Sequence, residues 1–240
     1  MKFSQALESG HLIKRYKRFL ADVELDSGAM ITVACPNTGS MLGCNVPGSR
    51  VWLSSSDSPT RKYRHTWELV EAPSGVIVGI NTGYPNRLVV EAIEAKVIKE
   101  LSGYREIKTE VRYGNENSRI DILLDGHAKN PPCYVEVKNV TAAVDNGIAV
   151  FPDAVSERGS KHLRELIAMV AEGFRSVLVF CVQRGDVHEV RPADAIDAVY
   201  GKTLRLALAS GVEVIAYRAR MSPQEIALEL KIPVVCPELK

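Results

Sequence analysis

The pattern of secondary-structure signals changes at Asn81, and this change constrains the fold more than any other feature of the sequence. Before it lie short strand-like runs separated by turn residues, with no amphipathic helix. After it, helical and strand patterns alternate to the end of the chain. We therefore predict two domains, one spanning residues 1–80 and one spanning residues 81–240, each long enough to bury a core of its own.

The first domain is expected to be a small β-barrel. A hairpin is predicted where two strand-like runs flank the turn Asp26-Ser27-Gly28. The expected strands cover residues 19–25, 29–35, 50–54, 65–71 and 76–81. Five short strands in this length favour a closed or partly closed barrel, and the OB-fold is the commonest five-stranded example.

The second domain is expected to contain a mixed sheet flanked by helices, because its helices and strands alternate in the order αβββαβ followed by αβα. The expected helices cover residues 86–101, 156–172, 194–209 and 222–230, the last of which starts at a Ser-Pro cap. The expected strands cover residues 107–113, 119–124, 133–138, 176–182 and 212–217.

Charge is nearly balanced overall but is divided unequally between the two domains. The chain has 30 Lys and Arg against 29 Asp and Glu, for a net charge of +1, which excludes an indiscriminate polyelectrolyte binder. Residues 1–80 hold 9 of these cations and 7 of the acids, and residues 81–240 hold the remaining 21 and 22. The barrel is therefore net +2, which is compatible with local contacts to phosphates.

Two further features bear on the cellular compartment. The five cysteines are odd in number and lack any CxxC or Cys/His ligand spacing, so we expect reduced thiols in a cytoplasmic protein without a zinc site. No run of about 18 apolar residues is present, so no membrane partner is expected. The sequence leaves the oligomeric state open.

Two neighbouring strands carry the residues that most strongly suggest chemistry. Asp121 lies within an apolar strand, and Glu136 and Lys138 share one face of the next strand because strand side chains repeat every two residues. The loop between these strands is short, so the two acids are expected to be neighbours. Paired carboxylates form an oxygen-rich site that suits Mg²⁺ or Mn²⁺. The alternative is a solvent-exposed Glu–Lys pair, but the αβββαβ context favours the metal site.

The flanking helices add candidate residues. Glu91 lies on the apolar side of the preceding helix, where a carboxylate needs a partner. Arg158, Lys161 and His162 occupy positions i, i+3 and i+4 at the start of the following helix, an arrangement suited to a phosphate backbone. Alternatively, such a basic stripe is simply an exposed helix face and the histidine is structural.

Cations and aromatic residues alternate in two segments of the first domain. The basic and aromatic candidates for DNA binding there are Lys14, Arg15, Tyr16, Lys17, Arg18, Arg61, Lys62 and Arg64. Cations follow phosphates while rings stack on bases, so this pattern is typical of binding to single strands or distorted duplexes. The alternative is that Phe19 and Trp67 are core residues and that the charges only cover turns.

Together these segments resemble the sugar fermentation stimulation protein A (SfsA) family over essentially the whole chain. The matching stretches are LIKRYKRFLADVEL, CPNTGSMLGCNVPG, RKYRHTWELV, NTGYPNRLVVEAI, SRIDILL, CYVEVKNVT and FPDAVSERGSKHLRELIAM. The resemblance implies an N-terminal OB-fold followed by a nuclease-like domain of the PD-(D/E)XK type. It implies that Asp121, Glu136 and Lys138 are the acids and lysine of that motif, with Ile120 in place of its proline, and that Glu91 is its helix glutamate. It also implies DNA binding and a link to the regulation of sugar, notably maltose, utilisation.

Two hypotheses of different classes follow. The first is a DNA-binding protein with a metal-dependent phosphodiesterase site, in which Asp121 and Glu136 hold Mg²⁺ or Mn²⁺, Lys138 activates water or steadies the transition state, and Glu91 orients the water or a second ion. The second is a non-catalytic DNA-binding regulator that retains the nuclease fold. A third reading is an RNA-processing factor, because OB-folds often bind RNA.

Overall fold

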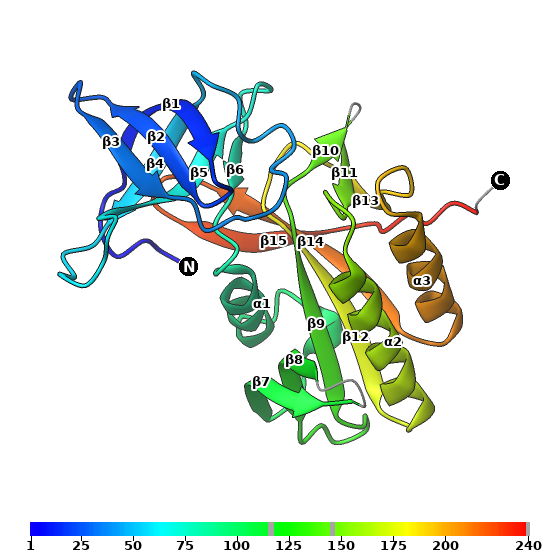
Figure 1. Cartoon of the computed structure of the whole chain (residues 1–240). Helices are drawn as coiled ribbons and strands as arrows, with labels where there is room; N and C mark the ends of the chain where they lie inside the picture. The colour runs from blue at the N-terminus through cyan, green and yellow to red at the C-terminus, as the bar shows by residue number, and fades with distance from the viewer. Residues whose placement is uncertain (115–117, 145–146, 239–240) are drawn as a thin grey trace.

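The computed structural model describes residues 1–114, 118–144 and 147–238, and it contains a β-barrel beside a mixed α/β domain (Figure 1). The barrel strands are β1 (Glu8–Tyr16), β2 (Leu20–Leu25), β3 (Met30–Ala34), β4 (Arg50–Ser55) and β5 (His65–Glu71), followed by the short β6 (Ile77–Gly79). Their order is β3-β2-β1-β4-β5, and a parallel pairing of Ala34 with Thr66 joins β3 to β5. This closed order of five strands confirms the predicted OB-fold.

Strand β1 is the one barrel strand that the sequence pattern did not predict. It is mostly polar, because only Gly10 and Leu12 of its nine residues are buried. Gly10 allows β1 to lie close to β2, since an added Cβ would stand 2.4 Å from the carbonyl oxygen of Glu24. The barrel core contains Trp67 and Leu53 at full burial. Trp67 is therefore a packing residue, as the alternative interpretation expected, whereas Phe19, which the same interpretation placed in the core, is 52 % exposed.

The second domain is built on a mixed sheet, as predicted, and this sheet has six strands where five were expected. Its order is β15-β14-β12-β9-β8-β7, in which β14, β12 and β9 are parallel and the other pairings are antiparallel. The strands are β7 (Glu106–Tyr113), β8 (Ser118–Asp125), β9 (Cys133–Val140), β12 (Arg175–Val182), β14 (Glu213–Met221) and β15 (Ile226–Ile232). A smaller sheet contains β10 (Ala143–Val144), β11 (Ile148–Phe151) and β13 (Glu189–Pro192), none of which was predicted.

Helices cover both faces of the large sheet (Figure 1). Helix α1 (Pro85–Glu94) packs Leu88 against Val135 and Val177 on one face. Helices α2 (Glu157–Ala171) and α3 (Ala198–Ala209) pack on the other, against Leu178 and Phe180. The first helix is shorter than the predicted 86–101, and after a break a single 3-10 turn, η1 (Lys99–Leu101), follows it.

The predicted helix at residues 222–230 is wrong, because most of this segment belongs to strand β15 (Ile226–Ile232) and the residues before it form a turn. Ile226 and Leu228 are buried at alternate positions, which is the period of a strand. The hydroxyl of Ser222 does accept a hydrogen bond from the backbone N–H of Glu225 at 3.0 Å, but this closes a tight turn into the antiparallel β14–β15 pair.

The two domains are joined by polar contacts around the loop at residues 35–44. The carboxylate of Asp153 accepts hydrogen bonds from the Ser40 hydroxyl at 2.9 Å and from the Met41 N–H at 3.1 Å. Thr82 donates its hydroxyl proton to the carbonyl of Pro36 at 2.9 Å. These contacts fix the barrel relative to the large sheet, while the division between residues 80 and 81 stays a prediction.

The cysteines are all free, and four of the five are buried. Burial raises the pKa of the Cys44 thiol to about 11, and it raises that of Cys181 to about 12. These thiols are therefore protonated at neutral pH and poorly reactive. Within the described ranges, no helix has both the length and the apolar content needed to cross a bilayer.

Candidate metal and nucleic-acid site

Strand β9 and helix α2 bring a glutamate, a lysine and a histidine side chain into contact. Glu136 and Lys138 lie on the face of β9 that α2 covers, and Lys138 Nζ is 2.6 Å from Glu136 Oε1. His162 on α2 directs Nδ1 at the same carboxylate oxygen, and this nitrogen lies 3.2 Å from Lys138 Nζ. Glu136 is only 1 % exposed. A buried charge of this kind persists because cationic or hydrogen-bonding partners stabilise it.

The carboxylate of Glu136 is held in its ionised form. Burial alone raises its pKa, but the charge of Lys138 and the contact with His162 outweigh burial, so its pKa lies below the usual value. Its second oxygen, Oε2, is buried and has no hydrogen-bond partner among the described residues. An ionised oxygen in this position is suited to accept a cation or a water held by one.

Asp121 on β8 is the second acid of the cluster. Its Oδ2 accepts a hydrogen bond from the backbone N–H of Val137 at 2.7 Å, and its Oδ1 accepts one from Asn86 Nδ2 at 2.9 Å. Burial raises the pKa of Asp121, and the neighbouring charge of Glu136 raises it further. Asn86 is a functional candidate that sequence reasoning missed, because an Asn in the first turn of a helix has no distinctive pattern.

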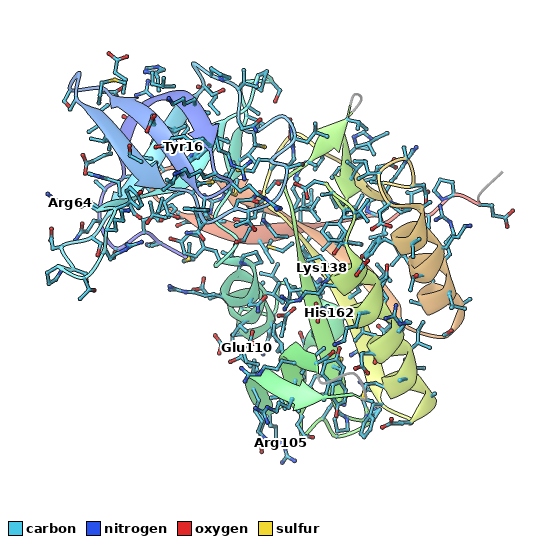
Figure 2. All side chains as sticks on the ribbon, viewed as in Figure 1. Tyr16, Arg64, Arg105, Glu110, Lys138 and His162 are labelled. Atoms are coloured by element: carbon cyan, nitrogen blue, oxygen red, sulfur yellow. The ribbon has the colours of Figure 1, made fainter. Side chains whose placement is uncertain are left out.

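A hollow of about 330 Å³ opens beside Asp121. It is lined by Glu110, Ser118, Arg119, Asp121, Arg158, Lys161 and His162. The structure thus places the three predicted residues of α2 next to a predicted metal ligand. Figure 2 shows Lys138 and His162 together between β9 and α2, with Glu110 at β7 below them. Glu110, Ser118 and Arg119 are additions that the sequence analysis did not identify.

The structure does not bring Glu91 into this cluster. Its Oε2 is 2.7 Å from the amino group of Met1, and its Oε1 accepts a hydrogen bond from Arg87 Nε at 2.8 Å. It lines a separate hollow with Ala227 and Leu228. Glu91 fails to reach Asp121 because α1 presents Asn86, and not Glu91, to β8.

The donor set fits a hard divalent cation with few protein ligands. Among the residues that the structure describes, no three His, Cys, Asp or Glu side chains are arranged to hold a metal ion. Mg²⁺ usually binds through one or two carboxylates and retains several waters or substrate phosphates. Asp121, with two acceptor oxygens, and the unpartnered Oε2 of Glu136 match that requirement.

The first basic segment of the barrel divides into structural and exposed residues. Arg15 donates through Nη2 to the backbone carbonyls of Arg18, Asn37 and Gly39 at 2.7, 2.9 and 2.9 Å, so its guanidinium holds loops together. Tyr16 and Lys14 are both directed at Asp22, at 3.0 and 3.5 Å.

Lys17 and Arg18 form the exposed tip of the β1–β2 hairpin. Both have left-handed backbone angles, with φ of 49° and 65°. Both side chains are exposed, but Arg18 Nε donates to the carbonyl of Thr38 at 2.9 Å, so Lys17 is the more accessible of the two to a phosphate backbone.

The second basic segment lies in the loop between β4 and β5. Arg61 donates to the hydroxyl of Thr66 at 2.9 Å, Arg64 forms an exposed ion pair with Asp57, and Lys62 lies 5.6 Å from the Tyr63 ring centre. Figure 2 shows Arg64 at the outer edge of the barrel, away from Lys138 and His162. The predicted nucleic-acid residues therefore form separate groups on the barrel and at the hollow.

Comparison with known proteins identifies the family. Residues 83–225 match the model described as the sugar fermentation stimulation protein RE domain, and residues 13–80 match the SfsA N-terminal OB domain. The chain belongs to the sugar fermentation stimulation protein (SfsA) family. Its second domain accordingly has a restriction-endonuclease-like fold, which confirms the predicted fold class.

Relatives in this family match over the full chain. A sugar fermentation stimulation protein homolog of Thioalkalivibrio sulfidiphilus is 60% identical and covers 98% of both chains. One from Alkalilimnicola ehrlichii is 57% identical and covers 99% of this chain and 100% of the relative. The solved structure described as Pyrococcus furiosus SfsA in complex with Ca²⁺ is 28% identical, with a TM-score of 0.87 and 98% coverage of both chains.

Proposed function

We propose that this SfsA-family protein binds DNA and that its second domain is a Mg²⁺- or Mn²⁺-dependent phosphodiesterase. The observation that carries the proposal is the convergence of Asp121, Glu136 and Lys138 beside a hollow lined by Arg158 and Lys161. Carboxylates, a lysine and phosphate-binding cations in one place are the components of metal-assisted phosphodiester hydrolysis. The Pyrococcus relative described with Ca²⁺ supports a divalent-ion site in the family.

Each residue has a role that follows from its place. Asp121 and Glu136 would hold the metal ion, which supplies Lewis-acid polarisation of a phosphoryl oxygen and of a nucleophilic water. Lys138 keeps Glu136 ionised and places a positive charge where negative charge develops during the reaction. Arg158 and Lys161 line the hollow, where they orient the phosphate backbone.

The test is a cleavage assay with defined substrates. The protein is incubated with single strands, flaps, junctions and nicked duplexes in Mg²⁺ or Mn²⁺, alongside Lys138→Ala. We expect metal-dependent cleavage of at least one substrate, and we expect the variant to lack it. If no substrate is cut, or if the variant cuts equally well, the phosphodiesterase proposal is wrong.

A second candidate function is a non-catalytic DNA-binding regulator, connected by family resemblance to sugar (maltose) utilisation. The observation that favours it is that Lys138 and His162 already occupy one oxygen of Glu136, so this acid is stabilised in part without a metal. This candidate predicts that Asp121→Asn leaves DNA binding and regulation unchanged. Competition between matched DNA and RNA strands decides which nucleic acid is preferred.

The contacts of the barrel predict different effects for two cations that are two residues apart in the chain. Lys17→Ala should leave stability unchanged but reduce the salt dependence of DNA binding by about one unit of slope, because one phosphate contact is lost. Arg15→Ala should lower the free energy of unfolding by about 2 kcal/mol, since three backbone carbonyls, two of them in half-buried contacts, lose their donor.

Fluorescence anisotropy of a labelled single strand against salt concentration, together with urea denaturation, measures both effects. An unchanged salt slope in Lys17→Ala would remove the hairpin tip from the proposed interface.

A further inference from the structure

Strands β7 and β8 each contribute one acid to the hollow, and one of these acids is the proposed metal ligand Asp121. The ladder pairs Thr109 with Ile122 and Val111 with Ile120, and the two acids that lie between these pairs, Glu110 and Asp121, both line the hollow. Two carboxylates that share one hollow repel each other. Glu110 also has a left-handed backbone angle, φ 57°, which is costly for a residue with a side chain. Neither feature stabilises the hairpin.

The hollow beside these two acids contains an independent sign of a ligand. The hydroxyl of Ser118 is buried and has no hydrogen-bond partner within the described part of the chain, and Ser118 lines the hollow at 5 % exposure. A buried hydroxyl without a partner is costly unless a ligand or water satisfies it. The hollow is large enough, because six waters around an ion occupy roughly 180 Å³ at about 30 Å³ each, against about 330 Å³ here.

We propose that Glu110 and Asp121 form the carboxylate pair of a subsite for a hydrated divalent cation, with the Ser118 hydroxyl bound to one of the ion's waters. This proposal rests on the proposed phosphodiesterase function and adds Glu110 to its site. A cation between the two acids removes their mutual repulsion. Water-mediated binding agrees with the lack, among described residues, of three acids or histidines that hold an ion directly.

The same hollow also explains the arginines beside the acids. Arg119 and Arg158 line it together with Glu110 and Asp121. A phosphate that contacts both the guanidinium groups and the cation would neutralise charges of both signs. The subsite is therefore expected to bind its ion more tightly when a nucleic-acid phosphate is present.

The first test is Mn²⁺ binding to the full-length, chelator-treated protein by isothermal titration calorimetry, without nucleic acid. Glu110→Gln should weaken Mn²⁺ binding by at least about tenfold, as is typical when a group supporting a metal is lost. The matched control is Glu106→Gln, which lies on the same strand, is exposed and pairs with Lys108 at 2.8 Å. The control should bind Mn²⁺ as the wild type does.

The second test separates backbone strain from ligand binding. Glu110→Gly removes both the carboxylate and the cost of the left-handed backbone, so it should raise the melting temperature of the metal-free protein by a few degrees. It should also lose most of the increase in melting temperature that Mn²⁺ gives the wild type. Higher stability with weaker metal binding is the result expected of a strained functional position.

Asp121→Asn makes the outcomes distinguishable. If Asp121→Asn weakens Mn²⁺ binding and Glu110→Gln does not, this inference is overturned while the proposed metal site stands. If neither variant changes the affinity, or if the wild type does not bind Mn²⁺, both proposals fail. Loss of affinity in both variants, with Glu106→Gln unaffected, supports the subsite.

Discussion

Replacing Lys138 by methionine is expected to lower the free energy of unfolding by about 3 kcal/mol and to reduce metal-dependent cleavage at least about 100-fold. The reason is the burial of its partner, since Glu136 is almost inaccessible and Lys138 Nζ lies 2.6 Å from its carboxylate. Methionine fills a similar volume but leaves that charge with His162 alone. Urea denaturation and the cleavage assay measure the two effects.

The stability loss in Lys138→Met should depend on pH in a defined direction. The pKa of Glu136 is lowered in the folded protein, so its ionisation contributes stability above the unfolded-state pKa of about 4.3, and that stability disappears as pH falls through the folded-state value. Lys138 is the main group that lowers this pKa. The difference between wild type and variant should therefore be largest above about pH 5 and should narrow in acid.

The control for this prediction is Lys108→Met on β7, where the partner Glu106 is exposed. An exposed ion pair contributes little to stability, so this variant should unfold as the wild type does at every pH. A Lys138→Met variant that is as stable as Lys108→Met would mean that Glu136 does not depend on its lysine.

The sequence was sufficient to predict those parts of the fold whose side chains follow a regular period. Glu136 and Lys138 are two residues apart in an apolar strand, so their common face followed directly from strand geometry. The same period was present in the segment of β15, but the Ser222-Pro pair resembles a helix cap. The segment pairs with β14 instead of forming a helix, and this pairing cannot be predicted from the segment alone.

The parts of the site that were missed depend on contacts between elements distant in sequence. Asn86 contacts Asp121 only because the fold packs α1 against β8. Glu110 becomes relevant only because it lines the same hollow as Asp121. Glu91 was expected at the site from its place on the apolar side of the helix, yet its carboxylate is directed at Met1 and Arg87. Side-chain direction on α1 is fixed by packing, which periodicity does not specify.

Asp121→Asn is expected to reduce metal-dependent cleavage by at least about 100-fold. The variant should still fold, and its stability relative to wild type should increase with pH. Burial, and then the charge of Glu136, raise the pKa of Asp121. For an acid with a raised folded-state pKa, the stabilising contribution is complete below the unfolded-state value of about 3.9 and is lost as pH rises through the folded-state value. Asparagine does not ionise, so the variant avoids this loss.

At low pH, hydrogen bonding determines the difference in stability between the wild type and Asp121→Asn. Asp121 accepts from both Val137 N–H and Asn86 Nδ2, whereas asparagine has only one acceptor oxygen, so the variant should be less stable than wild type by about 1 kcal/mol near pH 4. The gap should close or reverse by neutral pH, because ionised Asp121 then lies in an unfavourable buried position beside Glu136. Urea denaturation at several pH values without divalent ions measures the crossover.

The matched control is Asp57→Asn, because Asp57 is exposed and pairs only with exposed Arg64. That variant should change neither cleavage nor the pH dependence of stability. Adding Mn²⁺ should stabilise the wild type and the control but not Asp121→Asn, because only a protein that binds the ion in its folded state gains stability from it. An Asp121→Asn variant that loses stability relative to wild type as pH rises would show that Asp121 is stabilised, not destabilised, by its charge. The ionised carboxylate would then stabilise the folded protein, and metal binding would not relieve an unfavourable buried charge.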